Sequence, residues 1–365
     1  MSAAYDAVVA GGGLAGSAFA LRLARAGRRV ALIERTRTPK PKVCGDFLSA
    51  EALTLLQRLD VDLAKPGGHR IETFRIACGT AQADAPLGFA GLGFTRLRLD
   101  EILLSACVRE GVELLRGLTV SGLDTAGAPV RIRAGRRKLD ADCAALASGK
   151  LNVRGLPRHS NGPAAYKMTF VPGEHVQAAL GGVVQLALYS GGYLGACLVE
   201  EGGMTLCWIA DGNLVRATDG DWRRQLDVLA RGSDAIANLL EGASPNFDRP
   251  ATVAGLPFGY MRRDVIAPDV YPVGDQLAVI PPLAGDGTSI ALKSGLDAAD
   301  AMLRGETAGT FQRRFLKGLR SQFGWAVIVQ SVFSSEFGRR LAPRSVGALP
   351  GLATWLSRRT RLAGV

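Results

Sequence analysis

The sequence has few of the residues that usually carry acid-base and metal chemistry. Histidine occurs three times in 365 residues, and the six cysteines lie far apart with no C-x-x-C pair. This spacing excludes a zinc site built from cysteine pairs and the disulfide framework of a small secreted domain. We therefore expect no metal site, and we expect reduced thiols in a cytoplasmic protein.

A secretory leader and a membrane-spanning helix are not expected either. The first residues lack the basic segment of a secretory signal. Residues 176–199 are free of charge and long enough to span a bilayer, but they contain five glycines among alternating apolar residues. Because each glycine weakens a helix interior by about 1 kcal/mol, this stretch predicts strands and turns.

Aromatic residues are sparse, at 6% of the chain, and they do not alternate with basic residues. Proteins that stack single-stranded nucleic acid need such an alternation, so we expect no nucleic-acid partner. The net charge of +11 is concentrated near the C-terminus, where residues 304–365 hold eleven basic and two acidic residues. The rest of the chain is therefore close to neutral.

The first 34 residues show the order strand, glycine turn, helix, strand. Gly11, Gly13 and Gly16 form a G-x-G-x-x-G turn between the first strand and the helix. Such a turn lets the backbone approach a pyrophosphate that lies at the helix N-terminus. The expected elements are strands at 5–10 and 29–34 and a helix at 14–26.

Glu34 ends the second strand, where an acid accepts hydrogen bonds from the hydroxyls of a ribose. A carboxylate at this position also disfavours a 2′-phosphate. The unit therefore predicts binding of FAD or NAD, and not of NADP.

The remaining pattern predicts an α/β protein whose nucleotide-binding domain contains an inserted β-meander. Helices are expected at 50–59, 97–110, 222–240 and 287–303, and short strands at 112–115, 130–133 and 144–147. Residues 166–211 predict an antiparallel sheet of a second domain, and 270–280 a return to strand and loop. The expected division is a nucleotide-binding domain at 1–160 and 250–305, an antiparallel-sheet substrate domain at 161–249, and a basic helical C-terminal region at 306–365.

A second motif distinguishes FAD from NAD. Gly274 and Asp275 close a strand, which places a carboxylate where it can hold a ribityl hydroxyl. The segment IPPLAGDG at 280–287, with Pro282, Gly285 and Gly287, then leads into a helix. Its backbone N–H groups would face the electron-accepting edge of an isoalloxazine ring.

Together with Arg96 in the segment RLRLDEILL, these motifs resemble the FAD-dependent para-hydroxybenzoate hydroxylase fold superfamily. That superfamily includes aromatic hydroxylases, flavin halogenases and geranylgeranyl reductases. The segment KVCGDFLS at 42–49 and the glycines at 191–195 are similar to the reductase branch. The resemblance implies a Rossmann-like FAD-binding domain, with Cys44, Gly45 and Asp46 near the flavin as the catalytic candidates. The residues that it places on FAD are Gly11, Gly13, Gly16, Glu34, Arg35, Arg96, Asp275, Pro282, Gly285 and Gly287.

Two departures from the superfamily bear on the reaction. Hydroxylases usually carry an Asp-Gly motif after the meander, whereas this chain has Ser148, Gly149 and Lys150. The sequence therefore shows no motif for binding NAD(P)H, which remains a possible electron donor. The Trp-x-Trp signature of the halogenases is missing, so halogenation is not expected.

Two roles are open for Cys44. Its thiol follows Lys40 and Lys42, which would lower its pKa near the flavin, and its small size would equally suit it to shape the cavity. For Asp286 we expect capping of the following helix. In the second domain, Tyr189, Tyr193 and Trp208 are expected to line an apolar cavity, which predicts a small apolar substrate.

Three functions remain open from the sequence. The first is a monooxygenase that hydroxylates an apolar aromatic or polyketide-like substrate through a flavin hydroperoxide. The second is a flavin-dependent reductase or dehydrogenase that acts on a carbon–carbon bond of a lipid-like or isoprenoid substrate, which the altered Ser-Gly-Lys motif and the Cys-Gly loop favour. The third is a nonenzymatic electron-transfer flavoprotein, which a whole domain devoted to a cavity disfavours. We take the monooxygenase as the first hypothesis.

The basic C-terminal region also has two interpretations. Apolar stretches such as FGWAVIVQSVF separate its arginines, as in amphipathic helices that bind membrane surfaces. Either these helices pack their apolar face on the body of the protein, or they contact an anionic membrane surface, an acidic acyl-carrier protein or the CoA group of a substrate.

Overall fold

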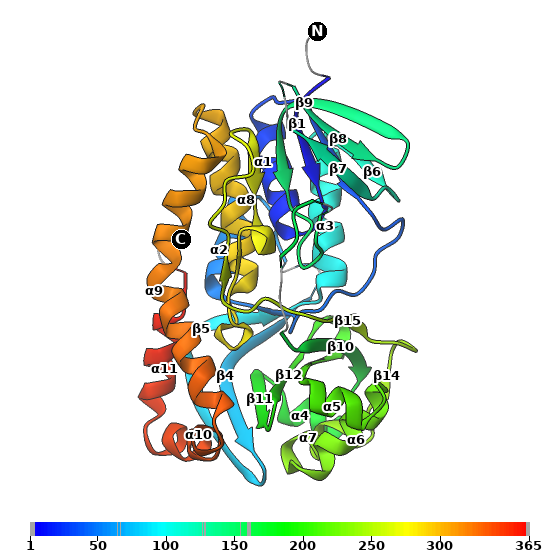
Figure 1. Cartoon of the computed structure of the whole chain (residues 1–365). Helices are drawn as coiled ribbons and strands as arrows, with labels where there is room; N and C mark the ends of the chain where they lie inside the picture. Colours follow the sequence, from blue (N-terminus) through cyan, green and yellow to red (C-terminus); the bar gives the residue numbers. More distant parts are fainter. Residues whose placement is uncertain are drawn as a thin grey trace.

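Two large β-sheets organise the chain, and the helices lie on and between them (Figure 1). The computed structural model describes residues 4–63, 65, 67–125, 127, 129–153, 155–158 and 162–362. The first sheet has the strand order β6-β2-β1-β9-β8-β7, and β17 pairs with β9. Its strands are β1 (Tyr5–Ala10), β2 (Val30–Glu34), β6 (Glu113–Arg116), β7 (Val120–Asp124), β8 (Val130–Ala134), β9 (Arg137–Leu146) and β17 (Val270–Pro272).

The first sheet combines a parallel part with an antiparallel meander. β1 pairs in parallel with β2 and β9, and β6 and β17 extend the parallel part. β7, β8 and β9 form the meander. β2 is buried along its whole length, as expected for an apolar strand that is covered on both faces.

Three helices pack beside one another on this sheet, namely α1 (Leu14–Arg25), α3 (Arg96–Arg109) and α8 (Gly287–Leu303). α1 contacts both of the others, and the contact with α8 is close because α8 carries Gly295. A Cβ atom at Gly295 would lie 2.2 Å from the carbonyl oxygen of Ala15. After it has formed the second sheet, the chain therefore returns to the first sheet, where α8 packs against α1.

The second sheet has the order β14-β10-β13-β12-β11-β4-β5-β3, and β15 pairs with β10. Its pairs are antiparallel except for β11 and β4, which are parallel. Its strands are β3 (Phe47–Leu48), β4 (His69–Cys78), β5 (Ala81–Gly93), β10 (Ala164–Val171), β11 (Val183–Tyr189), β12 (Gly192–Leu198), β13 (Met204–Ala210), β14 (Ser244–Pro245) and β15 (Ala251–Val253).

The second sheet draws strands from two distant parts of the sequence. The hairpin of β4 and β5 lies within 1–160, the range that the sequence assigned to the first domain, yet it pairs with β11 and β3. β4 and β11 are more than one hundred residues apart in the sequence, so no local sequence pattern predicts that they pair. Two short strands, β16 (Tyr260–Met261) and β18 (Ala278–Val279), form a further pair.

Short helices cover one face of the second sheet. They are α4 (Glu174–Ala179), α5 (Gly212–Ala217), α6 (Trp222–Arg231) and α7 (Asp234–Leu240), whereas α2 (Ala50–Arg58) packs against α8. The expected single helix at 222–240 is wrong. The helix breaks because Gly232 ends α6 and Ser233 takes an extended conformation, with φ −157° and ψ 114°.

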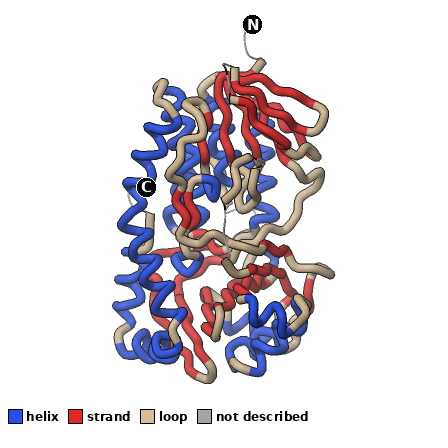
Figure 2. Tube along the Cα trace, viewed as in Figure 1, coloured by secondary structure: helices blue, strands red, loops and turns tan. Residues whose placement is uncertain are grey.

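The C-terminal region is helical, as expected, and joins the two sheets. It consists of α9 (Ala308–Ser334), α10 (Glu336–Ala348) and α11 (Pro350–Arg359). α9 packs on α8 and β17, and α10 and α11 pack on β4 and β5. Figure 2 shows this helical layer running along one side of both groups of strands. Among the helices of the described residues, none is long and apolar enough to cross a membrane.

Candidate functional site

Two neighbouring pockets lie along the carboxyl ends of the first sheet and between the two sheets. The nucleotide pocket is lined by the turn at 11–13 and by Glu34, Arg35 and Thr36. The central cavity is lined by strands of the second sheet, by loops that follow β1 and β9 of the first sheet, and by the segment 273–291. Gly13, Arg96 and Asp275 line both pockets, so a single extended ligand can reach from one into the other.

The glycine turn needs its glycines for two separate reasons. Gly11 has φ +122°, and a Cβ atom there would lie 2.3 Å from the carbonyl oxygen of Ala147. At Gly16 a Cβ atom would lie 2.0 Å from the carbonyl oxygen of Gly11, so this glycine permits α1 to approach the turn. Gly13 instead faces the pockets, where a Cβ atom would contact only Arg96 Nη2, at 3.6 Å.

Glu34 is buried in the wall of the nucleotide pocket. Its Oε2 accepts from the backbone N–H of Gly12 at 3.1 Å, and its Oε1 accepts from the N–H and Oγ1 of Thr36 at 2.9 and 2.7 Å. Burial alone would raise the pKa of Glu34, but Lys42 and these hydrogen bonds lower it. Glu34 is thus held as a carboxylate where a ribose hydroxyl would approach, and Arg35 lines the same pocket.

Arg96 begins α3, behind the N-cap Thr95, and forms a buried ion pair with Asp100. Arg96 Nε and Nη2 donate to Asp100 at 2.8 and 3.1 Å, and Lys42 Nζ lies 2.7 Å from the same carboxylate. Burial alone would raise the pKa of Asp100, but the two cations lower it. The guanidinium is therefore fixed at the junction of the two pockets.

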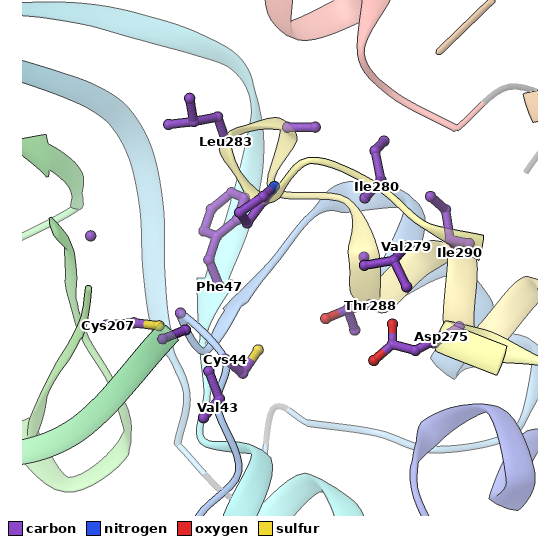
Figure 3. A pocket seen from close by; sticks show the side chains of 18 of the residues that line it. Val43, Cys44, Phe47, Cys207, Asp275, Val279, Ile280, Leu283, Thr288 and Ile290 are labelled. Carbon is purple, nitrogen blue, oxygen red and sulfur yellow. The ribbon is translucent and has the colours of Figure 1, made fainter. Parts of the chain in front are cut away.

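The segment 274–287 supplies the other wall of the central cavity. Asp275 Oδ2 lies 3.3 Å from Lys150 Nζ and faces both pockets. Pro282, Gly285 and Gly287 line the central cavity, and a Cβ atom at Gly287 would meet open space. Figure 3 shows Asp275 and Thr288 on this wall, with Cys44 and Cys207 on the side of the second sheet.

Asp286 does not cap α8, contrary to the expectation. Its Oδ2 accepts from Gln322 Nε2 at 2.6 Å and from the N–H of Leu362 at 2.7 Å, and its Oδ1 accepts from Ser49 Oγ at 3.2 Å. The carboxyl group thus joins α2, α8, α9 and the segment after α11. Burial raises its pKa to about 6, although Arg361 opposes this shift.

These features fit FAD. α2 and α3 are capped by Ser49 and Thr95, whereas α1 and α8 have no capping side chain among the described residues, and both begin at the pockets. Their first N–H groups are available for the pyrophosphate and for the flavin edge. The glycines at 13 and 287 keep side-chain atoms out of this space.

The three catalytic candidates separate into two groups. Cys44 and Gly45 line the central cavity, but Asp46 does not. The Asp46 carboxylate is wholly buried, where it accepts from the N–H of Arg96 at 3.0 Å and from Thr205 Oγ1 at 2.7 Å and pairs with Lys167 Nζ at 2.9 Å. With all these donors on it, Asp46 positions the loop and does not face the reacting groups.

The alternation of the strands corrects two of the three predicted cavity residues. Tyr193 lines the central cavity. Trp208 lies between Cys207 and Ile209, which both face the cavity, so its side chain is on the opposite face of β13. There it stacks on Tyr166 and donates from Nε1 to Gln225 Oε1 at 2.9 Å.

Tyr189 is also on the opposite face, because Val184 and Leu186 of the same strand line the cavity. Its hydroxyl donates to the carbonyl oxygen of Ile209 at 2.6 Å.

Other lining residues were not predicted from the sequence. They come from strands and segments whose pairing is set by the tertiary structure, and they include Phe47, Phe74, Leu256, Phe258 and Arg361. Phe47 follows the Cys-Gly-Asp loop directly, so its place near the flavin could have been inferred from that motif. The position of Arg361 has no local signal.

Comparisons with known proteins agree with this site. The FAD binding domain family matches residues 4–141. The menaquinone reductase of Mycolicibacterium smegmatis is 33% identical over 127 residues, which are 33% of this chain and 31% of that protein. The match thus covers about a third of the relative.

Solved structures extend the likeness to the whole chain at the level of the fold. The halogenase PltM in complex with phloroglucinol and FAD has a TM-score of 0.76 and 14% identity, over 97% of this chain and 82% of that chain. The geranylgeranyl bacteriochlorophyll reductase-like protein of Thermoplasma acidophilum has a TM-score of 0.73 and 18% identity, over 96% and 91%. The α/β fold and FAD as the cofactor, both predicted from the sequence, are confirmed.

The open face at Gly13 gives a test of the cofactor site. In Gly13→Val the new side chain projects beside Arg96 into both pockets, so we expect FAD affinity to fall by at least about tenfold. The measurement is a titration of the apoprotein with FAD. Ala26→Val, at the exposed opposite end of α1, introduces the same valine side chain and should retain FAD. Equal affinities for the two variants would contradict this placement.

Asp286 gives a prediction on pH. Its pKa is raised from 3.8 to about 6, so the folded state binds the proton more tightly than the unfolded state. The stability that this group contributes is present below pH 4 and is lost as the pH rises through 6, by about 3 kcal/mol. Urea unfolding between pH 4 and 7 should show this loss for the wild type relative to Asp286→Asn. The exposed variant Asp142→Asn should follow the wild type, and parallel curves for all three proteins would refute the prediction.

Proposed function

We propose that the protein is an FAD-dependent reductase that acts on a double bond conjugated to a carbonyl in an apolar, lipid-like substrate. The observation that carries this proposal is the chemistry of the central cavity. In its described lining, the groups on the second-sheet side that can exchange a proton are Cys44, Tyr193 and Cys207, and no histidine is among them. The carboxylate of Asp275 lies on the cofactor side, beside Lys150.

Two of these groups, Cys207 and Tyr193, keep their protons at neutral pH and so do not act as bases. Burial raises the pKa of Cys207 to about 12 and raises the pKa of Tyr193 well above its ordinary value. Both therefore stay protonated at neutral pH. A hydroxylase for phenols benefits from a base that takes up the phenol proton, and the described lining offers none on the substrate side.

The reaction needs two electrons and two protons for each double bond. Bound FAD in its reduced form would supply the electrons together with one proton. The other proton comes from Cys44 or Tyr193, which face the cavity, and is replaced from water. The side chains of Phe47, Phe74 and Phe258 hold the apolar part of the substrate and exclude water from it.

The comparisons also favour a reductase over a hydroxylase. A relative that matches a third of this chain is named a menaquinone reductase, and a quinone contains a double bond conjugated to carbonyl groups. Hydroxylation, the first hypothesis from the sequence, stays an untested alternative. NAD(P)H remains a possible electron donor.

An anaerobic half-reaction separates reduction from hydroxylation. The FAD-loaded protein is reduced with one equivalent of dithionite per flavin and mixed with trans-4-phenyl-3-buten-2-one, an apolar enone, without oxygen. We expect flavin reoxidation and a product that has gained two hydrogens. A product that has gained oxygen, formed only when oxygen is admitted, would overturn the proposal in favour of a monooxygenase.

The proton donors are tested in the same assay. The double variant Cys44→Ala, Tyr193→Phe should slow reoxidation about 100-fold while it retains FAD. Cys78→Ala removes a thiol that lies outside both pockets and should change the rate less than about twofold. Equal rates for the two variants would show that neither group delivers the proton.

We further propose that the C-terminal helices contact an anionic membrane surface, from which a lipid-like substrate can be drawn. The helices pack on the body, yet they expose large apolar side chains, with Phe337 at 77% exposure. Exposed basic residues lie on the same helices, and this pairing of apolar and basic groups is typical of interfacial helices. The exposed apolar set is Val327, Ile328, Val332, Phe337, Leu341, Leu349 and Trp355.

Vesicle sedimentation tests this surface. The wild type should sediment with vesicles of phosphatidylglycerol and phosphatidylcholine and remain in solution with phosphatidylcholine alone. Phe337→Ser should release about tenfold more protein, whereas Phe247→Ser, an exposed phenylalanine outside these helices, should not. Binding of an acyl-carrier protein with no binding of either vesicle would contradict the proposal.

A further inference from the structure

Arg361 reaches the central cavity from the end of the C-terminal helices. It follows α11, and its side chain is nine-tenths buried, with 10% exposure. It lines the cavity with Phe47, Leu87 and Leu283. The other cations of the described lining, Arg96 and Lys150, are paired with Asp100 and Asp275 at the cofactor side.

The structure holds the Arg361 backbone on both sides. Gln322 Nε2 donates to the carbonyl oxygen of Thr360 at 2.8 Å, and the N–H of Leu362 donates to Asp286 Oδ2 at 2.7 Å. The position of Arg361 is therefore set before any ligand binds.

Two aromatic rings hold the Arg361 guanidinium. It lies 4.4 Å from the ring centre of Phe89 and 5.7 Å from that of Phe47. A guanidinium above a ring face keeps its N–H groups in its own plane, directed away from the rings. These donors stay available for an acceptor.

No described residue accepts from Arg361 Nε or Nη1, although both atoms are buried. The nearest carboxylate oxygen, Asp286 Oδ1, lies 3.8 Å from Nη1, which is beyond hydrogen-bond distance. Asp286 already accepts from Ser49, Gln322 and Leu362. Buried donors almost always have a partner, so two unpaired donors at a cavity wall point to an acceptor that a ligand brings.

The charge of Arg361 is already compensated. Asp286 and Glu51 both act on the guanidinium electrostatically, against the burial that lowers its pKa. A second anion would therefore add a charge that the site does not need, whereas a neutral oxygen would satisfy the donors at no electrostatic cost.

We propose that Arg361 binds a neutral carbonyl oxygen of the apolar substrate and so fixes the end of the substrate that carries this group beside Phe47 and Leu283. This rests on the proposed function, which assigns the central cavity to a substrate. It adds a residue that selects for the carbonyl group of that substrate, independently of the proton donors.

The test measures binding to the oxidised, FAD-loaded protein by calorimetry, without turnover. The probes are 2-acetylnaphthalene, 2-ethylnaphthalene and 2-naphthoate, which share one ring system and differ in the oxygen group. Arg361→Met removes the donors and retains much of the volume. We expect it to reduce the affinity ratio of the ketone to the hydrocarbon at least about tenfold, as for the loss of a charged hydrogen bond.

Arg358→Met is the matched control, since Arg358 is exposed at the end of α11 and lines neither pocket. It should leave the ratio unchanged. Arg361→Lys retains the charge beside Asp286 and serves where the methionine variant loses its fold; it should give an intermediate ratio.

An unchanged ratio in both Arg361 variants, or equal weakening of all probes, would overturn the proposal, because the residue would then be structural. If the wild type binds naphthoate about tenfold more tightly than the ketone and loses this preference in Arg361→Met, the site is for an anion and the carbonyl proposal is wrong. Because this test measures binding without electron transfer, its result can be interpreted even if the reductase assay fails.

Discussion

The buried carboxylate of Asp46 is the contact on which the arrangement of the site depends. It accepts from the backbone of Arg96, at the start of α3, and pairs with Lys167 on β10, while Thr205 of β13 donates to the same group. The residue has φ +55°, a conformation that aspartate tolerates better than most residues. One side chain thus joins the Cys44 loop, α3 and the second sheet. Because a buried charge without its partner is costly, the three parts are held in one geometry.

The C-terminal helices close the cavity from the other side. Asp286 lies in the segment 280–287 and accepts hydrogen bonds from the backbone of Leu362 and the side chain of Gln322. These bonds tie the C-terminal helices to that segment. The same contacts carry Arg361 to the cavity wall. The basic region therefore lines the central cavity through Arg361 and also exposes apolar side chains at its surface.

The sequence predicted the cofactor half of the site much better than the substrate half. Gly11, Gly13 and Glu34 lie in one continuous unit, and their spacing determines their geometry because the turn and the strand end are local structures. Trp208 and Tyr189 were assigned to the wrong face, since a strand presents alternate residues to alternate faces and the sequence does not state which face is the cavity. Asp46 was placed at the flavin by its neighbours Cys44 and Gly45, but its carboxylate turns to Lys167, over one hundred residues away.

The sequence by itself determined the class of fold, the cofactor and the residues of the glycine turn, because each of these depends on short-range spacing and on the chemistry of a known ligand. Only the tertiary structure decided which residues face the substrate. The cavity is built from β3, β4, β11, β12 and β13 together with Arg361, and these segments meet through strand pairing and helix packing across the whole chain. Such contacts are driven by the burial of apolar surface. Many alternative strand pairings of the same sequence would also bury apolar surface, and only the folded protein shows which of them forms.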